Sequence, residues 1–371
     1  MNGDHADPPG DGKPDPTAPG VPHRRRARYP GTHPRRFEER YKERDAAKYP
    51  EMAEHVRAQG RTPAGTHVPI LVEEVLEVLA PRPGEVVADL TLGHGGHARA
   101  LLARVGPTGR LVALDHDEAA LRATRATLEA EGLAARASFH AVHFGAIPEV
   151  LAREGLDGCD VALADLGLSS MQIDDPSRGF SYRHDGPLDM RMDPRRSRTA
   201  AAVLAAIPEA DLAGALARYG DEPDAERIAR AVVAARESAP IESTARLAEI
   251  VLAARGTTPA AWKERARESP GEAHPAARTF QALRILVNDE MAGLERLLRV
   301  LPWCLRPGGR VAFLSFHSGE DRRVKRAFRE GLAAGLYEAV SDEVVRASPA
   351  EVGRNPRAAP AKLRWARRAR G

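Results

Sequence analysis

Cysteine is scarce in this sequence: Cys159 and Cys304 are the only two among 371 residues. Two isolated cysteines argue against a disulfide framework and against a zinc site built from thiolates. No uninterrupted apolar stretch reaches the length that spans a bilayer, and no charged and then apolar leader precedes a small-residue cleavage site. These absences predict a cytoplasmic protein with no membrane partner.

Two common enzyme signatures are also missing. The sequence has no Gly-x-Ser-x-Gly elbow and no Walker lysine loop, which disfavours hydrolases and nucleoside triphosphatases. His94 and His97 are spaced like metal ligands, but no neighbouring residues complete a closed set, so we expect no metal. The formal net charge is only +3 while the pI is about 9.0. This balance permits a polyanionic partner without requiring one.

The most informative feature that is present is the segment 86–97, an apolar strand pattern that breaks into a glycine-rich turn. A helix is predicted after it, over 98–105. Glycine lets the backbone approach a ligand because no Cβ intervenes, and a helix start presents free N–H groups. Asp115 ends the next predicted strand, about 20 residues past the glycines, where an acidic group is placed to bind ribose hydroxyls. The pattern predicts a site for a nucleoside-containing cofactor.

The choice of cofactor depends on what the turn lacks. The dinucleotide fingerprint needs a third glycine where Ala98 or Arg99 stands. The turn is short and bulky, without a pyrophosphate cradle, so a ligand with one ribose and no phosphate, S-adenosylmethionine, fits better. A tight turn in an ordinary α/β core remains the alternative.

The chain changes character along its length. Residues 1–62 are rich in Pro, Gly, Asp and Arg with almost no aliphatic residues, which predicts a disordered basic tail. Beyond it, strand and helix patterns alternate as in a parallel βαβ series; these are a helix ending at Ala80, strands over 86–92, 110–114, 137–144 and 160–166, and a helix over 118–131.

From about residue 174 to 274 the patterns are helical and no strand is convincing. Predicted helices in this region cover 199–206, 209–219, 225–237 and 244–254. A long helix over 279–300 and a strand over 308–316 then follow. We therefore expect an α/β sheet interrupted by a helical insertion.

Three further segments follow strands or lie in loops where ligands bind in open α/β sheets. Asp165 ends an apolar strand, and a buried carboxylate there must have a partner; it either caps the next turn or contacts a ligand. The segment 178–193 combines aromatics, arginines and carboxylates in a loop that is too irregular for a core element. His317 follows the late strand and is either a base or a structural histidine.

Together these segments resemble the ribosomal RNA small subunit methyltransferase H family, bacterial enzymes that methylate N4 of a 16S rRNA cytidine in the decoding centre. The resemblance covers about residue 66 to the end and is carried by the stretches 67–69, 91–97, 165–175, 178–181, 185–193, 274–284, 315–318 and 355–357. Two departures are Gly319, where the family usually has leucine, and the shortened segment 329–355.

The resemblance implies a class I, Rossmann-like methyltransferase sheet with an inserted all-helical domain. It divides the chain into a cofactor-binding first part over 66–175, a helical insertion for RNA and substrate recognition over 176–274, and a second part over 275–371. The implied cofactor is S-adenosylmethionine. Its contacts, carried over by motif, are Gly95, Gly96, His97, Asp115 on the ribose, Phe144 beside the adenine, Asp165 and Gln172.

The implied partner is 16S rRNA or the small ribosomal subunit, and a homodimer is open. Candidate catalytic residues are Asp165, Ser169, Asp185, Asp189 and His317, the last as proton acceptor or base-edge contact. The flipped base is expected against Phe180 or Tyr182. Phosphate contacts are expected from Arg183, Arg191, Arg195, Arg196 and Arg198. Two alternatives remain: an amino methyltransferase for another substrate, and an rRNA-binding module without catalysis.

Overall fold

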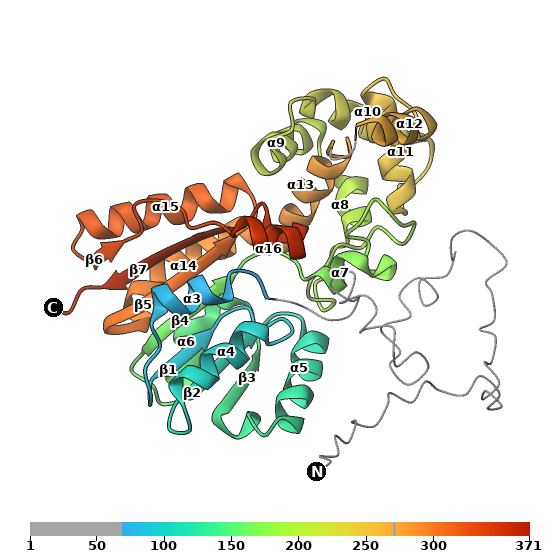
Figure 1. The fold of residues 1–371 in the computed structure, drawn as a ribbon. Helices are drawn as coiled ribbons and strands as arrows, with labels where there is room; N and C mark the ends of the chain where they lie inside the picture. Colours follow the sequence, from blue (N-terminus) through green and yellow to red (C-terminus); the bar gives the residue numbers. More distant parts are fainter. Residues whose placement is uncertain (1–68, 270–271) are drawn as a thin grey trace, which may run out of the picture.

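The computed structural model describes residues 69–269 and 272–371 (Figure 1). The predicted tail over 1–62 and the motif residues His67 and Val68 lie outside the described residues. In the part that is described, seven strands form one sheet. They are β1 (Val86–Asp89), β2 (Arg110–Asp115), β3 (Ala137–Ala141), β4 (Cys159–Asp165), β5 (Leu305–Ser315), β6 (Tyr337–Val340) and β7 (Lys362–Arg368).

The strand order is β3-β2-β1-β4-β5-β7-β6. The pairings among the first five strands in this order are parallel, whereas β7 is antiparallel to both β5 and β6. The chain therefore places the carboxyl ends of β1, β2, β4 and β5 along one edge of the sheet. The predicted α/β sheet is confirmed, while β6 and β7 were not anticipated.

Side chains alternate between the two faces of the sheet, so each face carries its own apolar core. One face packs against α3 (Val72–Leu79), α4 (Gly96–Val105) and α5 (Glu118–Ala130). The other packs against α6 (Ile147–Arg153), α14 (Glu290–Cys304) and α15 (Ser318–Ala333). Two short helices, α7 (Ser170–Asp174) and α16 (Pro349–Arg354), lie in the connections.

The helical region has a third core, separate from the two that cover the sheet. Its helices are α8 (Ala200–Ala206), α9 (Glu209–Gly220), α10 (Ala225–Ser238), α11 (Thr244–Ala254), α12 (Pro259–Glu268) and α13 (Ala277–Asn288). Figure 1 shows them as a group set to one side of the sheet. Phe280 and Leu283 of α13 belong to this core, although α13 follows the predicted end of the insertion at residue 274. That boundary stays a prediction.

The single long helix predicted over 279–300 is wrong, because the structure has two helices there. Asp289 separates α13 from α14 and takes a left-handed conformation with φ 51°. Aspartate tolerates this region better than most residues because its short polar side chain bonds locally. The break turns α14 away from the helical core and onto the sheet.

Two predicted strands end earlier in the structure. The strand predicted over 137–144 ends at Ala141, and Phe144 begins a 3₁₀ turn that His143 caps by accepting from Gly145 N. The first strand likewise ends at Asp89 rather than Leu92. Both differences move side chains out of the sheet and into the loops at its carboxyl edge.

A buried ion pair anchors α3 to the sheet. Arg310 of β5 is 8% exposed and donates to the carbonyl oxygens of Leu79 and Ala80 and to both carboxylate oxygens of Glu85. These bonds satisfy the last carbonyls of α3, which have no partner within the helix. None of the described helices combines the length and apolarity needed to cross a bilayer.

Candidate active site

The carboxyl edge of the sheet opens into a cavity of about 430 Å³. Loops from four strands line it: the glycine turn after β1, Asp115 at the end of β2, the segment from Asp165 after β4, and Phe316 and His317 after β5. Residues 180–183 complete the wall from the helical side. The volume lies within the range of small-ligand sites.

The glycine turn has the geometry that the sequence predicts. Gly93 and Gly95 have positive φ angles of 49° and 72°, and α4 starts at Gly96. A Cβ on Gly95 would lie 2.7 Å from the Thr124 side chain, and one on Gly96 would lie 2.8 Å from Pro69. Neither position has room for a side chain. The glycines Gly93 and Gly96 line the cavity, whereas Gly95 lines neither cavity and shapes the turn behind it.

Asp115 and Gln172 belong to one hydrogen-bonded unit. Asp115 accepts from Gly93 N at 2.8 Å and from Asp117 N at 2.9 Å, which fixes the turn against β2. Asp117 accepts in turn from Gln172 Nε2 at 3.0 Å and from Arg178 at 2.8 Å. Burial alone would raise the pKa of Asp117, but these two donors outweigh it and hold the pKa below its ordinary value. The unit joins the end of β2 to the segment after β4.

Ser169 and Gln172 also cap α7 reciprocally. Gln172 N donates to Ser169 Oγ at 3.2 Å, and Ser169 N donates to Gln172 Oε1 at 3.0 Å. This capping box satisfies two N–H groups at the helix start. Both side chains still line the large cavity, so they have a structural role beside any contact with a ligand.

Two carboxylates form an acidic floor in the cavity. Asp89 is 1% exposed, and burial raises its pKa to about 7. Burial raises the pKa of Asp165 to about 8, with the charges of Asp89 and Glu320 adding to the effect. His97 Nε2 lies 3.7 Å from Asp165 Oδ2. Carboxylates in this state favour a cationic ligand, because a nearby positive charge stabilises their ionised form.

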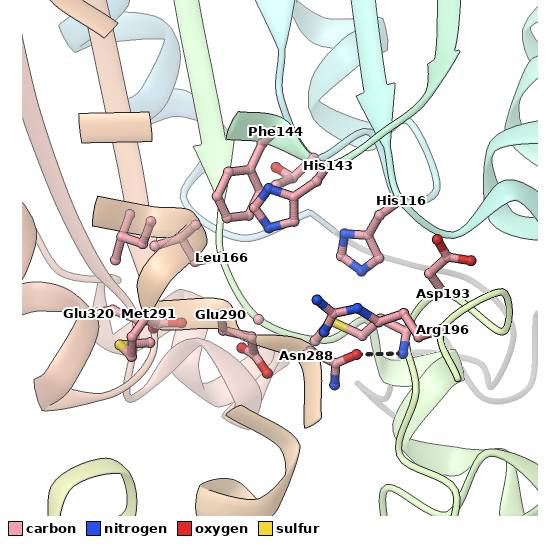
Figure 2. A pocket seen from close by; sticks show the side chains of 14 residues that line it. His116, His143, Phe144, Leu166, Asp193, Arg196, Asn288, Glu290, Met291 and Glu320 are labelled. Atoms are coloured by element: carbon pink, nitrogen blue, oxygen red, sulfur yellow. Dashed lines mark hydrogen bonds between the residues drawn. The ribbon is translucent and has the colours of Figure 1, made fainter. Parts of the chain in front are cut away.

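A second cavity of about 150 Å³ adjoins the first, and residues that include Thr91, His116, Leu166 and Glu320 line both. Phe144 lines this small cavity, and its ring centroid lies 3.9 Å from that of His143 (Figure 2). Burial and nearby positive groups lower the pKa of His143 to about 4, so the ring is neutral. The space is narrow and partly aromatic.

The segment 185–196 lies differently from what the sequence suggested. Asp189 makes an ion pair with Arg191 through both of its oxygens, and Asp185 accepts from Ala245 N at the start of α11. Neither carboxylate lines either of the two cavities. The structure therefore does not bring these two candidate catalytic residues to the site, and their contacts are structural.

The arginines of this segment are engaged within the protein. Arg195 pairs with Asp193, while Arg196 donates to Val287 O and pairs with Asp289. Arg196 and Asp193 thereby form a wall of the small cavity (Figure 2). Arg183 lines the large cavity.

A family model described as the MraW methylase family matches residues 64–369, which is most of the chain. The chain belongs to the MraW methylase family. It is similar to "Ribosomal RNA small subunit methyltransferase H 1" of Lachnoclostridium phytofermentans, with 44% identity over 346 residues, 93% of each chain. It is also similar to "Ribosomal RNA small subunit methyltransferase H" of Acidothermus cellulolyticus, with 46% identity over 325 residues, 83% of this chain and 95% of that protein.

Membership of the MraW methylase family confirms the resemblance that the motifs indicated. It also confirms the predicted methyltransferase class, with S-adenosylmethionine as methyl donor. Within the ranges 69–269 and 272–371, no group of three or more His, Cys, Asp or Glu residues could hold a metal ion.

Sequence reasoning about this MraW methylase missed three charged residues of the site. Asp89 lies in an apolar strand pattern just before the glycine turn. Arg284 and Glu320 lie on helices that are far along the chain from this turn. Of these three residues, only Asp89 could have been found from the sequence, because a carboxylate at the end of a buried strand needs a partner. The roles of the other two depend on which helices pack beside the cavity.

Proposed function

We propose that this chain transfers a methyl group from S-adenosylmethionine to N4 of a cytidine in small-subunit rRNA. The observation that carries the proposal is the pair of adjoining cavities at the carboxyl edge of the sheet, with the glycine turn and Asp115 at one wall and residues 180–183 at the other. One wall suits a nucleoside cofactor and the other suits a nucleobase.

The residues present fit the methyl donor. Gly96 would face its amino-acid portion, with Gly95 holding the turn behind it. Asp115 would face its ribose and Phe144 its adenine in the small cavity, with His97 and Gln172 completing the pocket. The donor is cationic at sulfur, and the acidic floor of Asp89 and Asp165 supplies the complementary charge. That complementarity supports a sulfonium ligand over a neutral nucleoside.

When bound, S-adenosylmethionine supplies an electrophilic methyl group on a positively charged sulfur. The N4 lone pair of cytosine forms the new N–CH₃ bond, and the electrons of the broken S–CH₃ bond remain on sulfur. N4 then gives one proton to an acceptor of the protein. Because this lone pair is delocalised into the ring, the site must orient N4 and accept hydrogen bonds from it.

Asp165 and Ser169 are the candidates for orienting N4, since both line the large cavity after β4. Tyr182 also lines this cavity and stacks on His274 with centroids 4.3 Å apart, which supports a role as a platform for the flipped base. The helical region over 176–274 would engage the RNA, and Arg183 at the cavity is the phosphate contact that we favour.

The small ribosomal subunit is therefore the expected partner, and the cytoplasm, where ribosomes assemble, the expected location.

The test is transfer of radiolabelled methyl to small ribosomal subunits from cells that lack the enzyme, with the modified nucleoside identified. The proposal expects N4-methylcytidine at one position of 16S rRNA. Transfer to another amine without rRNA would favour an amino methyltransferase of different substrate, and binding of rRNA without consumption of the donor would favour a non-catalytic module. Asp115→Ala serves as the variant that should abolish donor binding.

A further inference from the structure

The helical side of the large cavity carries a largely buried arginine, Arg284. Arg284 and Gln281 lie three residues apart on one face of α13, and both line this cavity. The Arg284 side chain is only 15% exposed. A charge as buried as this persists only where it is paired, so its partners show which part of the guanidinium is already engaged.

One edge of the Arg284 guanidinium is clamped by Glu290 of α14. Nε donates to Glu290 Oε1 at 2.8 Å, and Nη2 donates to Oε2 at 2.9 Å. Glu290 lines the neighbouring small cavity (Figure 2). A guanidinium has five N–H donors in one plane, and this clamp engages two of them. Nη1 lies outside the clamp, on a side chain that lines the large cavity.

Glu320 links Arg284 electrostatically to Asp165. Burial alone would raise the pKa of Glu320, but His317 and the charge of Arg284 outweigh it and hold the pKa below its ordinary value. The charge of Glu320 adds to the burial that raises the pKa of Asp165. Because such effects weaken with distance, Arg284 and Asp165 both lie near Glu320, and all three line one cavity.

His317 is held by the same glutamate. Its Nε2 lies 3.2 Å from Glu320 Oε1, its backbone N donates to Oε2 at 3.4 Å, and the two residues form the capping box of α15. These contacts fix the start of α15, and the role that they support for His317 is structural. The charged neighbours of Glu320 that remain for a ligand are Arg284 and Asp165.

The face of α13 that carries Arg284 also approaches Tyr182. Phe280, four residues before Arg284, meets the Tyr182 ring edge to face, with centroids 5.6 Å apart. Residues four apart lie on the same side of a helix. Arg284 therefore follows Phe280 along the wall where the flipped base would stack on Tyr182.

Cytosine and uracil differ along the edge that carries N3 and position 4. Cytosine has an acceptor at N3 and a donor amine at N4, whereas uracil has an N–H group at N3 and an oxygen at position 4. A carboxylate beside N4 and an arginine beside N3 match the cytosine order. Against uracil, the same two groups would set a donor against a donor.

We propose that Arg284 donates to N3 of the target cytosine while Asp165 accepts from its N4 amine. Arg284 is then the residue that recognises the base as cytosine, and Glu290 holds the plane of its guanidinium. A planar fork with one edge fixed presents its other donors in a set direction, which a lysine ammonium does not. This inference rests on the proposed function and specifies how its substrate base is recognised.

Exchange of one base atom tests the proposal on the unaltered protein. Small ribosomal subunits are reconstituted with 3-deazacytidine at the methylated position, which keeps the N4 amine but has C–H in place of N3. The full-length protein, with S-adenosylhomocysteine bound, should bind these subunits at least about tenfold more weakly than subunits with cytidine, because a hydrogen bond from a charged donor is lost. Equal affinity for the two would overturn the inference.

Arg284→Met completes a double cycle between the residue and the base atom. The variant should bind the two kinds of subunit within about threefold of each other, because no arginine is left to recognise N3. Its calorimetric affinity for S-adenosylhomocysteine should not change. Arg323→Met is the matched control, since Arg323 is 20% exposed, pairs with Glu295 of α14 at 2.8 Å and lines neither cavity. This control should keep the tenfold preference.

Two results for Arg284→Met would overturn the inference. Weaker binding of both subunits with the tenfold preference kept would assign Arg284 to a phosphate, and a loss of S-adenosylhomocysteine affinity would assign it to the donor. The wild-type comparison stands even if this variant does not fold. If the wild-type protein methylates no 16S rRNA, the proposed function has failed, whereas methylation without a preference for N3 defeats this inference alone.

Discussion

Asp165→Asn should stabilise the ligand-free protein, and more so at higher pH. Burial raises the pKa of Asp165 from 3.8 to about 8. Between these values the folded protein retains a proton that the unfolded chain has released, so wild-type stability falls as pH rises and levels off above about pH 8. Asparagine has no such proton, so the variant escapes this loss.

The size of the effect follows from the shift. One pKa unit corresponds to about 1.4 kcal/mol, so three units of pH between 5 and 8 give about 4 kcal/mol. A fifth of the Asp165 side chain is exposed, and Asp89 shares the titration, which together reduce the expected gain to about 2 kcal/mol. For a protein of this size that corresponds to a rise in Tm of about 4 °C.

The assay is thermal unfolding of wild type and variant at pH 5, 6, 7 and 8 without methyl donor. Asp342→Asn is the control, because Asp342 is exposed and lies outside both cavities, so the change removes one carboxylate without altering a buried group. A Tm difference for Asp165→Asn that does not grow with pH would refute the burial argument. In the methylation assay, unchanged turnover with normal donor affinity would refute the role of Asp165 in orienting N4.

Three further predictions concern the donor pocket and the fold. Gly95→Ala should lower the unfolding free energy by about 1–2 kcal/mol in urea titration and weaken donor binding, because it combines a φ of 72° with a Cβ 2.7 Å from Thr124. Phe144→Ala should weaken calorimetric binding of S-adenosylhomocysteine at least about tenfold; equal affinity would remove Phe144 from the adenine site. Arg310→Met should cost about 3 kcal/mol of stability by leaving the partly buried Glu85 unpaired, and adding Glu85→Gln should recover part of it.

Much of the site could be predicted from neighbouring residues in the sequence. The glycines of the turn, Asp115 and Asp165 all follow apolar strands, and parallel strands bring their carboxyl ends to one edge. Local rules fix such positions, since strand patterns and glycine conformations depend on adjacent residues. Phe144 and Gln172 came from family resemblance, and the structure places both beside the cavities.

Other features depended on contacts that the sequence does not display. The loop carboxylates Asp185 and Asp189 look like catalytic groups in the sequence, yet the structure pairs them with Ala245 N and Arg191. The predicted long helix was broken at Asp289, where tertiary packing overrides helical periodicity.

The sequence by itself determined the α/β class, the edge at which a cofactor binds and the family. Only the tertiary structure decided which charged groups are buried together: Asp89 with Asp165, and Glu320 with Arg284 and His317. Backbone patterns are encoded by residues close in the chain. The ionisation of a side chain depends instead on solvent exclusion and on charges brought near by distant elements.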